Sequence, residues 1–127
     1  MDQWVKSSIP LQMHRGCIIA SFQLDLDEKN LKLFRQELLS SIVEHNNLKG
    51  IIFDLSGLEI IDLVDFQGIK SIISMIKLTG FETVISGLKP AVVSSLILMD
   101  ADVDDLNAAL NLDEAYVILD NINRLKL

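Results

Sequence analysis

Carboxylate side chains gather in the middle of the chain, directly after a short apolar run. The run Ile51-Ile52-Phe53 has the length of a buried strand and no helical period, and it ends at Asp54. Ser56-Gly57 then marks a turn. Further on, Asp62 can cap a helix in whose first turn Asp65 lies. Because ligands and partners of α/β proteins meet the carboxyl ends of strands, we place the candidate functional site here.

The elements around this stretch alternate between strands and helices. We expect strands at 9–13 and 16–22, joined as a hairpin, and then at 50–54, 81–86 and 106–110. We expect helices from Asp25 or Asp27 to about 46, from about 63 to 78, from 91 to 99 after Pro90, and from Asp113 onward. This order predicts a single α/β domain with about four helices and a mostly parallel sheet of four to five strands that opens with a β-hairpin. Residues 1–8 are expected to be a lead-in, with Trp4 against the body, and residues 9–127 to be the domain.

The composition excludes several classes of partner. The 127 residues carry 18 acidic and 11 basic side chains, a formal net charge of −7. Nucleic acids and anionic membranes are held by clustered Lys and Arg, so we expect neither as a partner. The one cysteine, Cys17, lies in an apolar strand and is expected to be a buried core residue. No secretory or membrane-length apolar segment is recognisable, so we expect a cytoplasmic protein.

Known enzyme motifs are absent from the sequence. It contains no Walker phosphate loop, no G-x-G-x-x-G after the first strand and no G-x-S-x-G elbow. No Cys–His or Ser–His pair is suited to nucleophilic catalysis, and His14 is expected to be a solvated turn residue. We therefore expect no enzymatic activity, no cofactor and no metal.

Asp54 permits one interpretation of another class. An aspartate at the end of a buried strand resembles the phosphoryl acceptor of response-regulator receivers, which need Mg²⁺ held by carboxylates. Asp25 and Asp27 would then hold the metal, and Lys89 would lie near the phosphate. The opening hairpin, and the spacing of Ser86 only three residues before Lys89, depart from the receiver pattern. This interpretation is kept as the less favoured alternative.

The overall pattern resembles STAS domains, the anti-sigma-factor antagonist family. The resemblance rests on the run Asp54–Asp62 (DLSGLEIID) followed by a helix, and on Val84–Val92 (VISGLKPAV). It covers residues 9–119, and segments 61–62, 75–80, 86–92 and 108–114 are similar to the single-domain scaffold of bacterial stressosomes. It implies the STAS fold and a partner-switching function.

The resemblance also implies a phosphorylation switch. In the family, a serine directly after the motif aspartate is phosphorylated by a dedicated kinase, and the added charge of about −2 breaks a protein interface. That position is Leu63 here, which carries no hydroxyl. Three interpretations stay open: an engineered or natural form that resembles the unphosphorylated state, which we favour; a phosphorylation site moved to Ser86; or a scaffold that is never switched.

We therefore expect a stressosome scaffold or partner-switching protein. By resemblance, it co-assembles in a large complex with sensor proteins that carry C-terminal STAS domains, and the complex sequesters a serine/threonine switch kinase. Asp62, Leu63, Val64 and Asp65 would form part of the partner interface. The alternative within the binding class is a free-standing antagonist that binds an anti-sigma factor.

Overall fold

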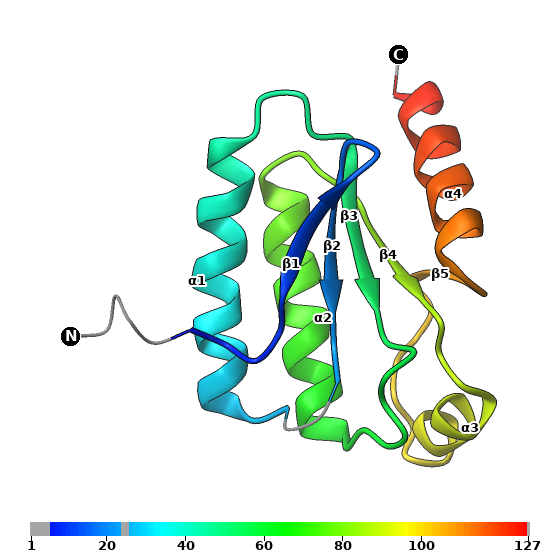
Figure 1. Cartoon of the computed structure of the whole chain (residues 1–127). Coiled ribbons are helices and arrows are strands. Elements are labelled where there is room, and N and C mark those ends of the chain that lie inside the picture. Colours follow the sequence, from blue (N-terminus) through cyan, green and yellow to red (C-terminus); the bar gives the residue numbers. More distant parts are fainter. Residues whose placement is uncertain (1–5, 24–25, 127) are drawn as a thin grey trace.

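The strands and helices follow the predicted order. The computed structural model describes residues 6–23 and 26–126, so Trp4 and Asp25 lie outside the described residues. The strands are β1 (Leu11–His14), β2 (Cys17–Ser21), β3 (Gly50–Asp54), β4 (Thr83–Ser86) and β5 (Asn107–Ala109). The helices are α1 (Glu28–Glu44), α2 (Leu63–Leu78), α3 (Pro90–Leu98) and α4 (Leu112–Leu125) (Figure 1).

Local capping explains where the helices begin. Asp27 caps α1 by accepting a hydrogen bond from the Asn30 amide at 2.7 Å, and Pro90 takes the first position of α3. The predicted start of α4 at Asp113 is one residue late. Asn111 is the cap, and its side chain accepts a hydrogen bond from the Glu114 amide at 2.9 Å.

The five strands form one sheet in the order β1-β2-β3-β4-β5. The hairpin strands β1 and β2 are antiparallel, and all later pairs are parallel. Receivers are doubly wound sheets with the order 2-1-3-4-5, in which the strand order reverses at a switch point. The parallel strands here run without such a reversal, so the receiver interpretation is wrong about the fold.

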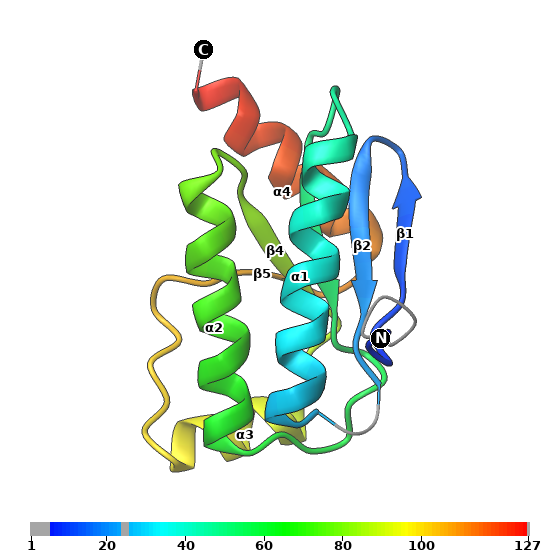
Figure 2. The same ribbon diagram turned by 90° about the vertical axis from the view of Figure 1, so that its left-hand side faces the viewer.

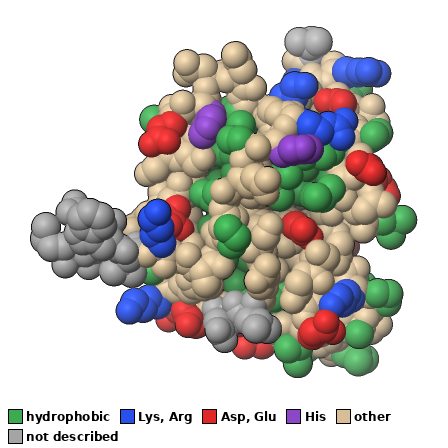
Figure 3. Space-filling view, in the orientation of Figure 1, with side chains coloured by type: hydrophobic (Ala, Val, Ile, Leu, Met, Phe, Trp, Pro, Cys, Tyr) green, Lys and Arg blue, Asp and Glu red, His purple; other side chains and the backbone are tan. Residues whose placement is uncertain are grey.

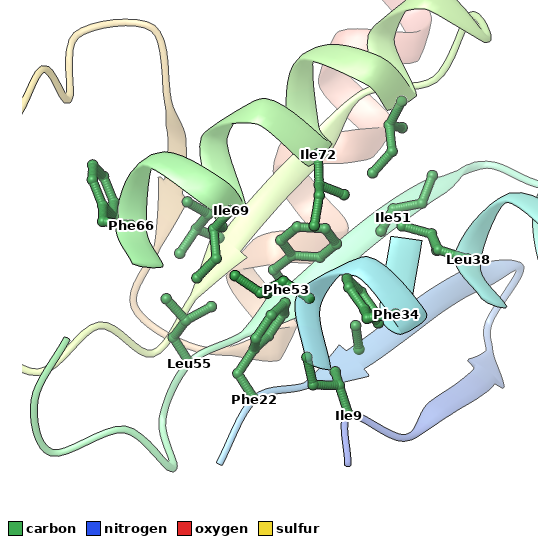
Figure 4. Packing of buried hydrophobic residues seen from close by; sticks show 14 of the residues in the cluster. Ile9, Phe22, Phe34, Leu38, Ile51, Phe53, Leu55, Phe66, Ile69 and Ile72 are labelled. Carbon is green, nitrogen blue, oxygen red and sulfur yellow. The ribbon is translucent and has the colours of Figure 1, made fainter. Parts of the chain in front are cut away.

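Helices cover both faces of the sheet. Figure 2 shows α1 and α2 side by side over one face, with α4 behind the sheet and α3 near the ends of α2 and the strands. On the α1–α2 face, Phe22, Phe34 and Phe53 meet with ring centroids 5.0–5.7 Å apart (Figure 4). All three are fully buried, so an aromatic cluster fixes α1 on the central strands.

The α4 face is smaller and includes the cysteine. Cys17 is buried there as predicted, and burial raises the pKa of its thiol, so it is a core residue. His14 is exposed, but its Nδ1 lies 2.8 Å from the hydroxyl of Tyr116, a contact that the sequence did not indicate. Figure 3 shows the two histidine side chains as separate patches in the upper half of the view.

Candidate partner-binding surface

The loop between β3 and α2 is anchored to the hydrophobic core by apolar side chains. Leu55, Leu58 and Ile61 are buried in the core, whereas Ile60 points outward with 78% of its surface exposed. Asp54 begins the loop, and its Oδ1 accepts a hydrogen bond from the Ser56 amide at 3.0 Å. The loop therefore has a fixed path, with Ile61 in the core and Ile60 toward solvent.

The start of α2 is capped as the sequence predicted. The Asp62 side chain accepts a hydrogen bond from the Asp65 amide at 2.8 Å, and its carbonyl accepts one from the Phe66 amide at 3.0 Å. Phe66 is buried, so it holds the first turn of the helix against the core. These contacts define the orientation of the residues between them.

Two apolar side chains lie between the two aspartates. Leu63 is half-buried, and Val64 is 74% exposed. Val64 and Asp65 border a groove of about 450 Å³ between α1 and α2, and Asp62 and Asp65 border another of about 300 Å³ beside the preceding loop. The four residues predicted as a partner interface are thus brought together on a ridge between two grooves, with Val64 more accessible than Leu63.

The surroundings of Asp65 on this ridge disfavour the charged form of its carboxyl group. Burial raises the pKa of its carboxyl, and the neighbouring charges of Asp62 and Asp27 and a side-chain hydrogen bond with Asp62 raise it further. A cationic group on a partner would relieve this repulsion. The ridge is therefore suited to a partner that brings positive charge together with apolar surface.

Ser86 lies apart from this ridge, at the end of β4. It pairs in register with Asp54 of β3, and together with Ser56 these residues border a groove of about 500 Å³ that continues to the start of α4. Ser86 is only 1% exposed, and its hydroxyl has no hydrogen-bond partner among the residues that the structure describes. Leu63 and Ser86 thus belong to two different surfaces.

The residues that a receiver site would need are not assembled. Asp27 is engaged as the cap of α1, and the Lys89 ammonium forms an ion pair with Glu59. Within the described ranges, no group of three or more His, Cys, Asp or Glu side chains is placed to hold a metal ion. Asp25, the other proposed ligand, lies outside those ranges.

Sequence patterns did not indicate the links between α3 and its neighbours. The Lys89–Glu59 pair joins the start of α3 to the loop before α2, and Lys70 of α2 pairs with Asp102 at 3.8 Å. These partners are 30 and 32 residues apart in the chain. In the part of the chain described, no helix is both long and apolar enough to cross a membrane.

The comparisons with known proteins agree on one family. The sequence profile of the STAS domain matches residues 8–115. A serine-to-glutamate variant of RsbS from Moorella thermoacetica is 30% identical, covers 93% of this chain and 99% of its own, and superposes with a TM-score of 0.77. A chain from a structure described as the molecular architecture of the stressosome, a signal integration and transduction hub, is 29% identical, covers 91% of this chain and 99% of its own, and has the same TM-score, 0.77.

One curated relative is longer than this chain. RsbRD of Bacillus subtilis (strain 168), an RsbT co-antagonist protein, is 28% identical over 81 residues, which is 61% of this chain. The alignment spans only 29% of the length of that relative. The anti-sigma factor antagonist SpoIIAA is 14% identical with a TM-score of 0.60, which shows a shared fold alone.

Proposed function

The chain belongs to the STAS domain family, and from that premise we propose that it is a non-catalytic, partner-switching scaffold of a stressosome-type complex. In this proposal it co-assembles in the cytoplasm with RsbR-like sensor STAS proteins, and the assembly sequesters an RsbT-like serine/threonine kinase. The ridge at the start of α2 carries the proposal. There, an exposed Val64 and a half-buried Leu63 lie between two aspartates, in a chain that is similar to RsbS over nearly its whole length.

Leu63 determines the state in which the scaffold binds. It holds the first position of α2, next to free amides and the positive end of the helix dipole, where a phosphate would be well placed. Leucine accepts no phosphate and adds no charge, so the ridge keeps its apolar character. We therefore assign the ridge at the start of α2 to a binding-competent state that resembles the unphosphorylated form.

Ser86 is the proposed secondary phosphosite. Because its hydroxyl is buried, a kinase would reach it only after the end of β4 opened locally. A phosphate there would act on the groove beside Asp54 and α4 rather than on the ridge. A phosphate at Ser86 would therefore act by opening the fold locally, and not by adding charge to the ridge at the start of α2.

Size-exclusion chromatography with light scattering tests the proposal. The chain is run alone and mixed with the STAS sensor protein encoded beside its gene, at low salt and several concentrations. We expect the mixture to form a very large co-eluting particle. Leu63→Glu places a charge among the carboxylates of the ridge and is expected to abolish this particle. Urea unfolding of the variant alone checks that it stays folded.

The matched control is Leu78→Glu, at the other end of α2, where the side chain is 89% exposed. This variant is expected to assemble like the wild type. If the wild-type protein and the sensor elute separately under all conditions, the scaffold proposal fails. A small complex with an anti-sigma factor would then support the alternative, a free-standing antagonist.

A further inference from the structure

Helix α3 lacks the charged outer face that the other helices carry, and its one exposed polar side chain is Ser94. Residues 90–98 contain no charged side chain, whereas charged residues are spread along α1, α2 and α4. Val92 and Leu96 face the core, but Ile97 is 59% exposed, Leu98 is 85% exposed and Val93 is also exposed. A surface helix normally turns charged side chains to water, so this apolar face is unusual for a helix in contact with solvent alone.

The exposed residues form one continuous surface on a well-held helix. Val93 and Ile97 are four residues apart and therefore neighbours on the helix, and Leu98 is likewise the neighbour of the exposed Ser94. The helix is held at its start by the Lys89–Glu59 ion pair and at its end by the hydrogen bond from the Ala101 amide to the Leu96 carbonyl, at 3.0 Å. In Figure 3, hydrophobic side chains gather at the lower right, over α3. We call Val93, Ile97 and Leu98 the α3 face.

Acidic residues follow the α3 face directly. The segment 100–105 contains four aspartates, all exposed: Asp100, Asp102, Asp104 and Asp105. Asp102 is paired with Lys70, and within the described ranges the other three form no ion pair. This segment, which we call the acidic rim, directly follows the α3 face in the chain, and its charge is largely uncompensated.

We propose that the α3 face binds a partner protein through a segment that presents apolar side chains flanked by Lys or Arg. The apolar part would cover Ile97 and Leu98, and the basic part would neutralise the acidic rim. A second copy of this chain is disfavoured, because a two-fold contact would place the two acidic rims together. An anionic membrane surface is disfavoured by the same charge. This surface is separate from the α2 ridge, and the proposal can be tested on the chain alone.

The test uses a peptide of defined chemistry as the probe. A synthetic helical peptide with leucines on one face and lysines on the other is titrated into the isotope-labelled chain, and amide shifts are mapped by NMR. We expect the shifts to concentrate in residues 90–105 and the affinity to fall with added salt. The double variant Ile97→Asn/Leu98→Gln should weaken binding at least tenfold, and Leu78→Gln, at an equally exposed leucine of α2, should not.

Several outcomes would overturn the proposal. Equal binding of a leucine–glutamate peptide, shifts centred on the α2 ridge, or wild-type affinity of the double variant would each do so. A dimer in analytical ultracentrifugation that the double variant loses would assign the face to a second copy. Adsorption to phosphatidylserine vesicles that the double variant loses would assign it to a membrane.

A variant outside the apolar face separates a loss of binding from a loss of folding. Asp104→Asn/Asp105→Asn changes two exposed side chains and leaves the core untouched. It is expected to weaken peptide binding and to reduce its dependence on salt. Unchanged affinity and salt dependence would mean that the rim takes no part, and the proposed partner chemistry would be wrong.

Discussion

Asp65 is subject to opposing effects at the start of α2. The positive end of the helix dipole favours its charged form, as the sequence suggested. Burial and the nearby carboxyls of Asp62 and Asp27 oppose that form and raise the pKa of Asp65. Because the folded-state pKa lies above the unfolded one, stability from this residue is lost as pH rises through the folded pKa.

We predict that Asp65→Asn raises the free energy of unfolding at pH 7, by up to about 0.5 kcal/mol, as befits a surface site. Well below pH 3.8, the ordinary value for an aspartate, both states of the wild type are protonated and the difference should vanish. Urea unfolding of both proteins at pH 7 and near pH 3 measures this. A wild type that is more stable than the variant at pH 7 would show that the dipole dominates.

Ser86 provides a second prediction at the scale of one residue. A buried hydroxyl without a partner carries a desolvation cost of about 1–3 kcal/mol. Ser86→Ala removes that cost, so the urea midpoint should stay level or rise. Ser86→Asp places a charge in the same site and should lower the free energy of unfolding by more than about 2 kcal/mol.

The two Ser86 variants also bear on regulation. If Ser86→Asp folds as stably as the wild type, the site tolerates charge, and phosphorylation there would act as a surface mark. A clear loss of stability in Ser86→Ala would mean instead that the hydroxyl makes a stabilising hydrogen bond.

Helices and strands with strong local sequence signals could be predicted with their bounds. Elements that form mainly through tertiary packing were harder to predict. The bounds of β3 and α2 agree with the prediction, because an apolar run, the cap at Asp62 and the glycine at position 80 act locally. The strand β5 was signalled weakly, since its Ala-rich residues have little preference for a strand. It forms because it pairs with β4 and because the buried Ala115 of α4 packs in the same cluster as Ala109.

The location of the candidate site could be predicted from the sequence, but the exposure of its side chains could not. The cap and the first residues of α2 could be read from spacing, but the greater exposure of Val64 depends on how α1 and α2 pack. The burial of Ser86 depends on the neighbouring strands, and the contact between His14 and Tyr116 joins residues 102 positions apart. Periodicity carries no information about such pairs. The apolar α3 face likewise resembled an ordinary core helix in the sequence.

The position of α4 on the sheet depends on a glycine in β3. A Cβ atom at Gly50 would lie 2.8 Å from a methyl group of Leu119 and 3.2 Å from the carbonyl oxygen of Glu82. Leu119 is buried, so either its side chain adopts another rotamer within the packed core or α4 shifts. We predict that Gly50→Ala lowers the free energy of unfolding by about 1–3 kcal/mol, the usual cost of overpacking.

A double-mutant cycle separates this clash from other effects of alanine. Leu119→Ala alone leaves a cavity, and a methyl group at position 50 would partly fill it. The double variant should therefore lose less stability than the two single variants together. Simple additivity would show that the cost of Gly50→Ala comes from the carbonyl of Glu82 or from the strand itself.

At the scale of the whole molecule, acidic side chains outnumber basic ones, and few of those that the structure describes form ion pairs. The chain has a net charge of −7, and the described residues form four ion pairs, each at least partly exposed to solvent. Exposed pairs contribute about 0–1 kcal/mol each and weaken with salt. Repulsion among the excess carboxylates also weakens with salt, and it destabilises the compact state. The sign of the salt effect therefore shows which contribution is larger.

We predict that added salt stabilises the fold and weakens the binding of partners. Going from about 10 mM to about 100 mM NaCl shortens the Debye length from about 30 Å to about 10 Å, which screens the repulsion. The urea midpoint should rise over this range, and choline chloride should act like NaCl if screening is the cause. Binding of the sensor protein, or of the basic peptide at α3, should weaken over the same range, because charge attraction contributes to it. A midpoint that falls with salt would mean that the ion pairs, including Lys89–Glu59 at the start of α3, outweigh the repulsion.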